Sequence, residues 1–135
     1  MVGELVEACH RRGMRISLYY SQPDWHHPNF VHLPGAFKDL PAVPQDQTPD
    51  WAKYIRYFHG QVRELCTHYG RIDGIWFDGS HKQEQTWGGR KVYRLIKQYQ
   101  PGAIVNDRSG YGDIFTPERS LPDDLDGYMH ECCQA

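Results

Sequence analysis

The fold of this chain is decided by residues 69–79, which read YGRIDGIWFDG. Gly70 is the kind of residue that ends a helix, and the apolar run behind it stops at Asp78. In a parallel α/β sheet such a run forms a buried strand, whose last residue points into the crevice where ligands bind. Asp78 is therefore a candidate catalytic residue, and Gly79 is expected to let a substrate approach the backbone closely. The alternative is an aspartate that caps a loop.

Composition limits the classes of protein that fit. The 135 residues suffice for one domain and one core, with 39% hydrophobic and 24% charged residues. A net charge of −2 gives no electrostatic reason to expect binding to nucleic acid or an anionic membrane. No apolar run approaches the ~18 residues of a spanning helix. The N-terminus lacks the basic start and apolar block of a signal peptide, and the compartment stays open.

Cysteine spacing argues against a disulfide framework. Four cysteines are present without a Cys-x-x-Cys spacing, and the adjacent Cys132 and Cys133 are poorly placed to pair with each other.

Hydrophobic periodicity predicts helices alternating with strands. We expect helices over 2–12, 48–69 and 89–99, and strands over 15–20, 72–78 and 103–108. Gly13 is the expected C-cap of the first helix, and Thr48 followed by Pro49 is the expected start of the second. Residues 21–47 carry five prolines and read as a long loop, and the chain from Ser109 on also reads as loop.

The order α-β-loop-α-β-α-β predicts a parallel sheet with right-handed crossovers. Polar and aromatic clusters follow each strand, as in a (β/α)₈ TIM barrel or a doubly wound sheet. Three strands cannot close a barrel of about 250 residues. We therefore expect an α/β fold in which residues 1–135 form about three consecutive βα units of a larger catalytic barrel, without its first and last strands.

Paired carboxylates on such a barrel suggest glycoside hydrolysis. A retaining glycosidase needs one carboxylate as nucleophile and another as proton donor. Asp78 suits the first role, and the available donors are Glu118 and Glu131. For Glu118 taken alone, a solvated loop acid is the competing interpretation.

Three further side chains are candidates for binding a sugar. Arg108 ends the third predicted strand and could hold Asp78 ionised or bind a hydroxyl, although a structural ion pair with Asp107 or Asp113 is the alternative. Trp25 and Trp76 offer apolar ring faces to a sugar, with core packing as the alternative. No Gly-x-Gly-x-x-Gly follows any strand, which disfavours a Rossmann-type nucleotide site.

The sequence resembles the α-L-fucosidases of glycoside hydrolase family 29 over nearly its whole length. Four motifs in register carry the resemblance: Leu18-Tyr19-Tyr20-Ser21 with Asp24-Trp25-His26-His27-Pro28, Trp76-Phe77-Asp78-Gly79, Val105-Asn106-Asp107-Arg108, and Phe115-Thr116-Pro117-Glu118. Any one of these motifs alone would be a weak signal.

The resemblance implies a role for each candidate. Asp78 stands where the family has its nucleophile, and Trp76 and Arg108 stand where family members contact fucose. Glu118 matches the acid/base of a Thr-Pro-Glu-like motif. Glu131 is the alternative, because other members use a glutamate after a tryptophan; here His130 precedes it.

The implied activity is a retaining exo-hydrolysis that releases α-L-fucose from fucosylated oligosaccharides or glycoconjugates. The His-His-Asp-Gly-Phe motif of upstream strands is absent, and we expect the usual C-terminal β-sandwich of the family to be missing as well, so we expect the chain alone to be inactive. The alternatives are a different retaining glycosidase on the same fold and a non-catalytic barrel remnant. Neither cofactor nor metal is expected, because the adjacent His26 and His27 would point differently and, with His32, have no acidic or cysteine partner at fitting spacing.

Overall fold

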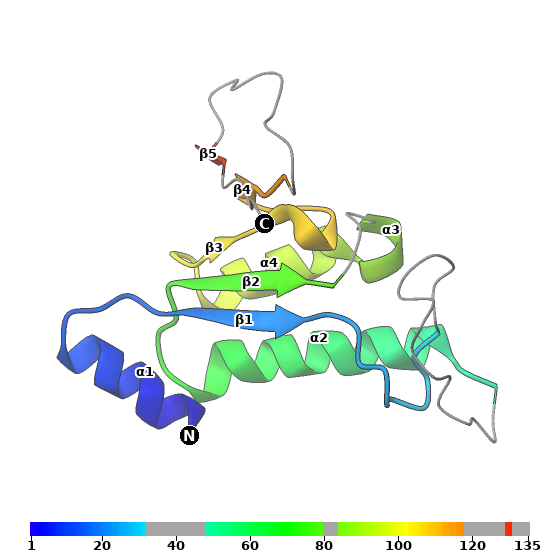
Figure 1. Cartoon of the computed structure of the whole chain (residues 1–135), viewed down its shortest axis with the longest axis horizontal. Coiled ribbons are helices and arrows are strands. Elements are labelled where there is room, and N and C mark those ends of the chain that lie inside the picture. Colours follow the sequence, from blue (N-terminus) through cyan, green and yellow to red (C-terminus); the bar gives the residue numbers. More distant parts are fainter. Residues whose placement is uncertain (32–47, 80–83, 118–128, 131–135) are drawn as a thin grey trace.

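The computed structural model describes residues 1–31, 48–79, 84–117 and 129–130. In chain order the elements are α1 (Val2–Arg11), β1 (Ser17–Ser21), α2 (Trp51–His68), β2 (Gly74–Asp78), α3 (Glu84–Trp87), α4 (Gly89–Tyr99), β3 (Ile104–Val105), the 3₁₀ turn η1 (Asp107–Ser109), β4 (Ile114–Phe115) and β5 (Met129–His130) (Figure 1).

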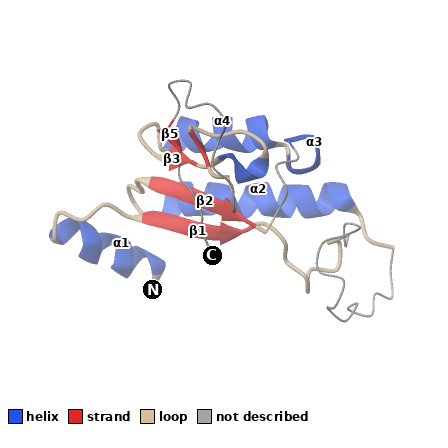
Figure 2. Cartoon of the chain, turned by 45° about the horizontal axis from the view of Figure 1, so that its top comes forward, coloured by secondary structure: helices blue, strands red, loops and turns tan. Residues whose placement is uncertain are grey.

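The central sheet is parallel and has the order β1-β2-β3. Tyr19 lies opposite Trp76 in the β1–β2 register, and Ser21 lies opposite Asp78. The carboxyl ends of β1 and β2 therefore meet at one edge of the sheet. Figure 2 shows α2, α3 and α4 behind these strands, so that on the described part of the chain the helices cover one face of the sheet.

Alternation along β2 assigns its side chains to the two faces. Ile75 and Phe77 are buried in the core, where the Phe77 ring meets the Phe58 ring of α2 edge-on at 5.7 Å. Trp76 and Asp78 point to the other face and are only partly buried. This uncovered side, which also carries Tyr19 of β1, is called the open face below.

Identifiable caps define the end of α1 and the start of α2. Gly13 follows α1 with φ +69°; its N–H bonds to the carbonyl of His10, and the Met14 N–H bonds to that of Cys9, as in a Schellman motif. The predicted N-cap of α2, Thr48, is wrong by two residues. Asp50 is the N-cap, because its carboxylate accepts a 3.2 Å bond from the Lys53 N–H.

The C-terminal third departs most from expectation. The third strand is shorter than 103–108, because η1 begins at Asp107. The chain after Ser109 is not all loop: β4 and β5 pair in parallel, and a bridge joins Asn106 to Ile114 of β4. The one-turn helix α3 was not foreseen, since a four-residue segment is too short to show periodicity.

Candidate active site at the carboxyl end of β2

Asp78 ends β2 on the open face, and its two carboxylate oxygens have different partners. Oδ2 accepts a 2.7 Å hydrogen bond from the hydroxyl of Tyr19. Oδ1 lies 3.5 Å from Nη1 of Arg108. The Asp78 side chain keeps 38% of its surface exposed, whereas that of Arg108 keeps 9%. The carboxylate is thus oriented by two donors and still accessible, which suits a nucleophile better than a loop cap.

Asn106 brings the third strand's end against β2. Its Oδ1 accepts from the N–H of Phe77 at 2.8 Å, and its Nδ2 donates to the carbonyl of Phe77 at 2.9 Å. The buried amide therefore imitates a paired strand backbone where β3 has already ended, and it satisfies two backbone groups that would otherwise be buried unpaired. The register of the segment beside Asp78 is fixed by this contact.

Thr116, which is itself bonded to Asp107, accepts a hydrogen bond from Arg108. One oxygen of Asp107 accepts from both the N–H of Thr116 at 3.0 Å and its hydroxyl at 2.8 Å. The same hydroxyl oxygen accepts a 3.0 Å bond from Nε of Arg108. All three side chains are buried. Of the two aspartates proposed as alternative ion-pair partners of Arg108, Asp113 pairs with Lys97 at 2.8 Å, and Asp107 accepts both hydrogen bonds from Thr116.

Tyr19 is the site residue that sequence reasoning missed. Its hydrogen bond to Asp78 raises the pKa of the phenol, and partial burial adds to the rise, so Tyr19 remains a donor. No local pattern in the sequence identifies Tyr19, because its place beside Asp78 depends on the β1–β2 register. In a parallel pair that ends level at Ser21 and Asp78, the residue two before Ser21 shares the face of Asp78 and lies on its diagonal.

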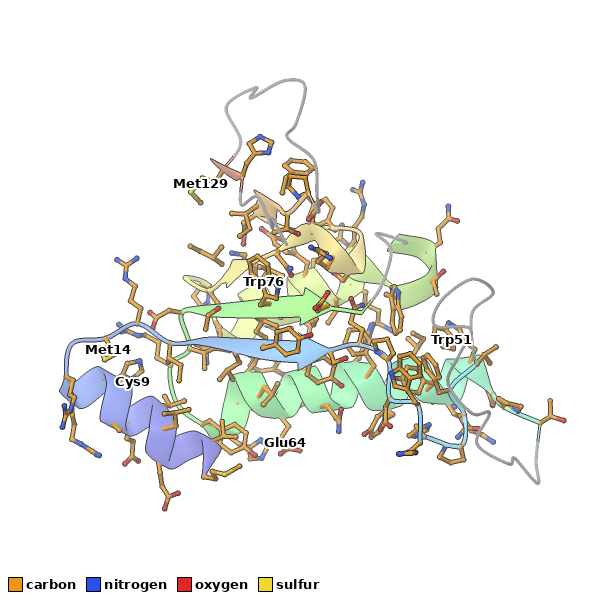
Figure 3. The ribbon with its side chains drawn as sticks, viewed as in Figure 1. Cys9, Met14, Trp51, Glu64, Trp76 and Met129 are labelled. Carbon is orange, nitrogen blue, oxygen red and sulfur yellow. The ribbon has the colours of Figure 1, made fainter. Side chains whose placement is uncertain are left out.

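Trp76 and Gly79 flank the nucleophile candidate. Trp76 is half-buried on the open face, two residues before Asp78 and outside the core formed by the described residues (Figure 3). Gly79 adopts φ +80°, and a Cβ there would lie 2.7 Å from Cδ of Pro23. The glycine is thus required by the backbone turn and by Pro23 of the loop after β1.

Trp25 lies in that same loop, in a different environment. Its ring stacks on Phe30 with centroids 6.5 Å apart and planes at 27°. Phe30 in turn contacts Trp51 and Tyr54 at the start of α2. The described stacking therefore groups Trp25 with aromatic residues around α2.

The two candidate proton donors, Glu118 and Glu131, lie outside the described residues. The strands that precede them in sequence do pair with each other: Phe115 of β4 lies opposite His130 of β5, and their rings stack at 5.6 Å.

The described ranges contain neither a candidate metal cluster nor a candidate membrane-spanning helix. Within them, no group of three or more His, Cys, Asp or Glu side chains is placed to hold a metal ion, and His32 is not among the described residues. No described helix has the length and apolar character needed to cross a membrane. Cys9 and Cys66 are free thiols, and burial raises the pKa of Cys66 to about 11.

Comparison with known proteins gives one consistent answer. The family model described as Alpha-L-fucosidase matches residues 1–135. The solved α-L-fucosidase isoenzyme 1 from Paenibacillus thiaminolyticus is 32% identical, with a TM-score of 0.74 over 98% of this chain and 36% of that one. The Lactobacillus casei α-L-fucosidase AlfC, solved with α-L-fucose product, is 27% identical, with a TM-score of 0.69 over 98% of this chain and 45% of that one.

A curated plant relative agrees with these structures. Alpha-L-fucosidase 1 of Arabidopsis thaliana is 26% identical over 113 residues, which is 82% of this chain and 19% of that protein. The chain thus spans about a fifth of its curated relatives and less than half of these solved enzymes. The match along its full length shows that this chain belongs to the α-L-fucosidase family.

Proposed function

We propose that this chain supplies the nucleophile-bearing part of an α-L-fucosidase active site, within a partial (β/α)₈ barrel of about three βα units. The observation that carries the proposal is Asp78, which is exposed at the carboxyl end of a parallel strand and held by Tyr19 and Arg108. Functional residues of barrel enzymes lie at this end of the strands. The substrate class is α-L-fucosides of oligosaccharides or glycoconjugates, as the family membership suggests.

The proposed reaction is a double displacement. A carboxylate oxygen of Asp78 attacks the anomeric carbon and forms a covalent bond as the bond to the glycosidic oxygen breaks. Glu118 gives its proton to that leaving oxygen, and then accepts a proton from the water that attacks the anomeric carbon and releases Asp78. Two inversions return the original configuration. Glu131 is the alternative acid/base.

The surroundings of Asp78 are suited to this chemistry. Tyr19 and Arg108 together fix the plane of the carboxylate, which favours a productive line of attack. Trp76 on the same face offers an apolar surface for the sugar ring, and Trp25 is proposed to bind substrate from the loop after β1. A cation and a phenol that are already positioned lose little freedom when charge moves during the reaction.

The isolated 135 residues are proposed to give little or no turnover. They match 36% of the Paenibacillus enzyme, so nearly two thirds of that enzyme has no counterpart in these residues. A decisive assay therefore needs a complete barrel. We define the segment-exchange enzyme as the Paenibacillus thiaminolyticus α-L-fucosidase in which residues 1–135 replace the segment they match.

The test is hydrolysis of 4-nitrophenyl α-L-fucoside by the chain alone, by the segment-exchange enzyme and by its Asp78→Ala variant. Folding is verified for each by circular dichroism and thermal melting. The proposal expects turnover in the exchange enzyme and a loss of at least about 10³-fold with Asp78→Ala. A folded exchange enzyme that binds fucose without hydrolysis would favour the non-catalytic alternative. Faster cleavage of a different nitrophenyl glycoside would favour another retaining glycosidase.

A further inference from the structure

We propose that Thr116 is a positioning residue, whose hydroxyl fixes the guanidinium of Arg108 beside Asp78. The proposal rests on the proposed function, since it assigns Thr116 a part in that same site. Three buried side chains carry it: Thr116 is 1% exposed, and Asp107 and Arg108 are each 7% exposed. We call the contacts among Asp107, Thr116 and Arg108 the threonine clamp.

Each hydrogen bond of the threonine clamp has a fixed donor and a fixed acceptor. The hydroxyl of Thr116 donates its one hydrogen bond to Oδ1 of Asp107 at 2.8 Å. Its lone pairs are then left to accept a hydrogen bond from Nε of Arg108 at 3.0 Å. The N–H of Thr116 reaches the same Asp107 oxygen at 3.0 Å, so backbone and side chain of Thr116 are held together. Position 116 therefore requires a side chain that donates one hydrogen bond and accepts another. An apolar side chain, or one that can only donate, cannot replace threonine.

The guanidinium is planar and rigid, so a bond at Nε sets the direction of both Nη atoms. Nη1 of Arg108 faces Oδ1 of Asp78 at 3.5 Å, which is longer than the 2.7–2.9 Å typical of a strong charged hydrogen bond. The 3.0 Å contact with Thr116 is the tighter of the two. The threonine clamp, more than the ion pair, therefore determines where the positive charge lies relative to the nucleophile.

The same clamp also fixes the start of the segment that continues to a proposed proton donor. Thr116 directly follows β4, and Glu118 is two residues further along, after Pro117, whose ring restricts φ. Asp107 thereby joins the end of the segment beside β2 to the segment that precedes Glu118. One hydroxyl group therefore links the guanidinium beside Asp78 to the residue two before Glu118 in the sequence.

Two substitutions of Thr116 distinguish a structural role from a positioning role. Thr116→Val keeps the shape and removes the hydroxyl, while Thr116→Ser keeps the hydroxyl and removes a methyl group. Both are made in the chain itself and in the segment-exchange enzyme. In the ¹⁵N-labelled chain, the Arg108 Nε–H resonance is expected to be slow to exchange in wild type and Thr116→Ser, and to broaden or shift toward free arginine in Thr116→Val.

In the exchange enzyme, Thr116→Val is expected to lower kcat/KM for 4-nitrophenyl α-L-fucoside by roughly 10–100-fold, mainly through kcat, because small misplacements near reacting groups have effects of this size. Thr116→Ser should stay within about threefold of wild type. In an Arg108→Lys background, which lacks Nε, Thr116→Val should add a smaller loss than it causes in wild type, since one of the two hydrogen bonds that it removes is already gone.

Two results would overturn the proposal. One is a Thr116→Val enzyme with unchanged kcat/KM at a temperature where it is folded, even if its Tm is lower. The other is a full additional loss in the Arg108→Lys background. Failure of the proposed function itself is distinguishable, because Asp78→Ala would then retain activity whatever the Thr116 variants do.

Discussion

The hydroxyl of Tyr19 donates a 2.7 Å hydrogen bond across neighbouring strands to Oδ2 of Asp78. Arg108 approaches the other carboxylate oxygen, so the two oxygens are distinguished by their partners. Strand register produces this relationship, since Tyr19 lies diagonally before Asp78 on the open face. The orientation of the proposed nucleophile is therefore a property of the sheet.

Removing the Tyr19 hydroxyl is expected to affect activity and leave stability nearly unchanged. In the segment-exchange enzyme, Tyr19→Phe should lower kcat/KM by about 10-fold, the equivalent of one hydrogen bond of about 1.4 kcal/mol. The free energy of unfolding measured by urea denaturation should change by less than about 0.5 kcal/mol, because Tyr19 is 63% exposed.

Tyr20→Phe is the matched control for Tyr19→Phe. Tyr20 points to the other face, where its hydroxyl donates to Gln61 of α2. Its loss should reduce stability by about 1 kcal/mol with little effect on kcat/KM. Equal effects of the two substitutions on activity would contradict the assignment of Tyr19 to the site.

Replacing Asn106 should destabilise the chain. Asn106→Leu leaves both the N–H and the carbonyl of Phe77 buried without their partners, at a cost of about 2–4 kcal/mol by urea denaturation. Asn29→Ala is the control, because that partly buried side chain accepts a single bond from the Asp50 N–H. A cost no larger than that of Asn29→Ala would show that the amide does not hold the strand.

His59 gives the chain an acid-sensitive stability. Its Nε2 lies 3.0 Å from the carbonyl of Trp87, and burial lowers its pKa. Below an ordinary value of about 6.5 the unfolded state binds the proton more readily than the folded state. The His59 contribution is therefore fully present above that pH and is lost as pH falls below it.

Urea titrations of wild type and His59→Gln between pH 5 and 8 measure this effect. Glutamine can still donate to the Trp87 carbonyl but does not titrate. The stability of wild type should fall relative to His59→Gln as the solution is acidified through about pH 6.5. Parallel pH profiles of the two proteins would argue against a neutral, buried His59.

Gly79 should tolerate no side chain. Gly79→Ala combines φ +80° with a Cβ 2.7 Å from Pro23, and we expect a loss of about 1–3 kcal/mol. At Gly102 a Cβ meets nothing within 4 Å and φ is not positive, so Gly102→Ala should be neutral or slightly stabilising. Thermal melts of the pair make the comparison, and similar Tm values would refute the strain argument.

Several parts of this molecule were predictable from its sequence because local patterns decide them. The Gly70-to-Asp78 pattern predicts β2, and the apolar period together with the Pro101-Gly102 stop predicts α4 at 89–99. The α-β alternation correctly predicts a parallel sheet. Asp78 and Arg108 were predicted to lie together, and the structure pairs them.

The other features of the fold and the site depend on contacts between residues that are far apart in the sequence. Asn106 replaces strand backbone with a side chain, so β3 is shorter than its apolar run indicates. Thr116 appeared only as a motif residue, because its clamp depends on Asp107 being folded against it. Tyr19 required the β1–β2 register, which no local pattern specifies. The roles of Glu118 and Glu131 stay predictions.

Covalent trapping of the nucleophile tests the central claim most directly. A 2-deoxy-2-fluoro-fucosyl fluoride slows the hydrolysis of a covalent intermediate more than its formation, so the label accumulates on the attacking residue. The segment-exchange enzyme would be inactivated with this reagent, digested and sequenced by mass spectrometry. We predict a single fluorofucosyl group on Asp78. A label on any other residue, or no label on an enzyme that hydrolyses 4-nitrophenyl α-L-fucoside, would contradict it.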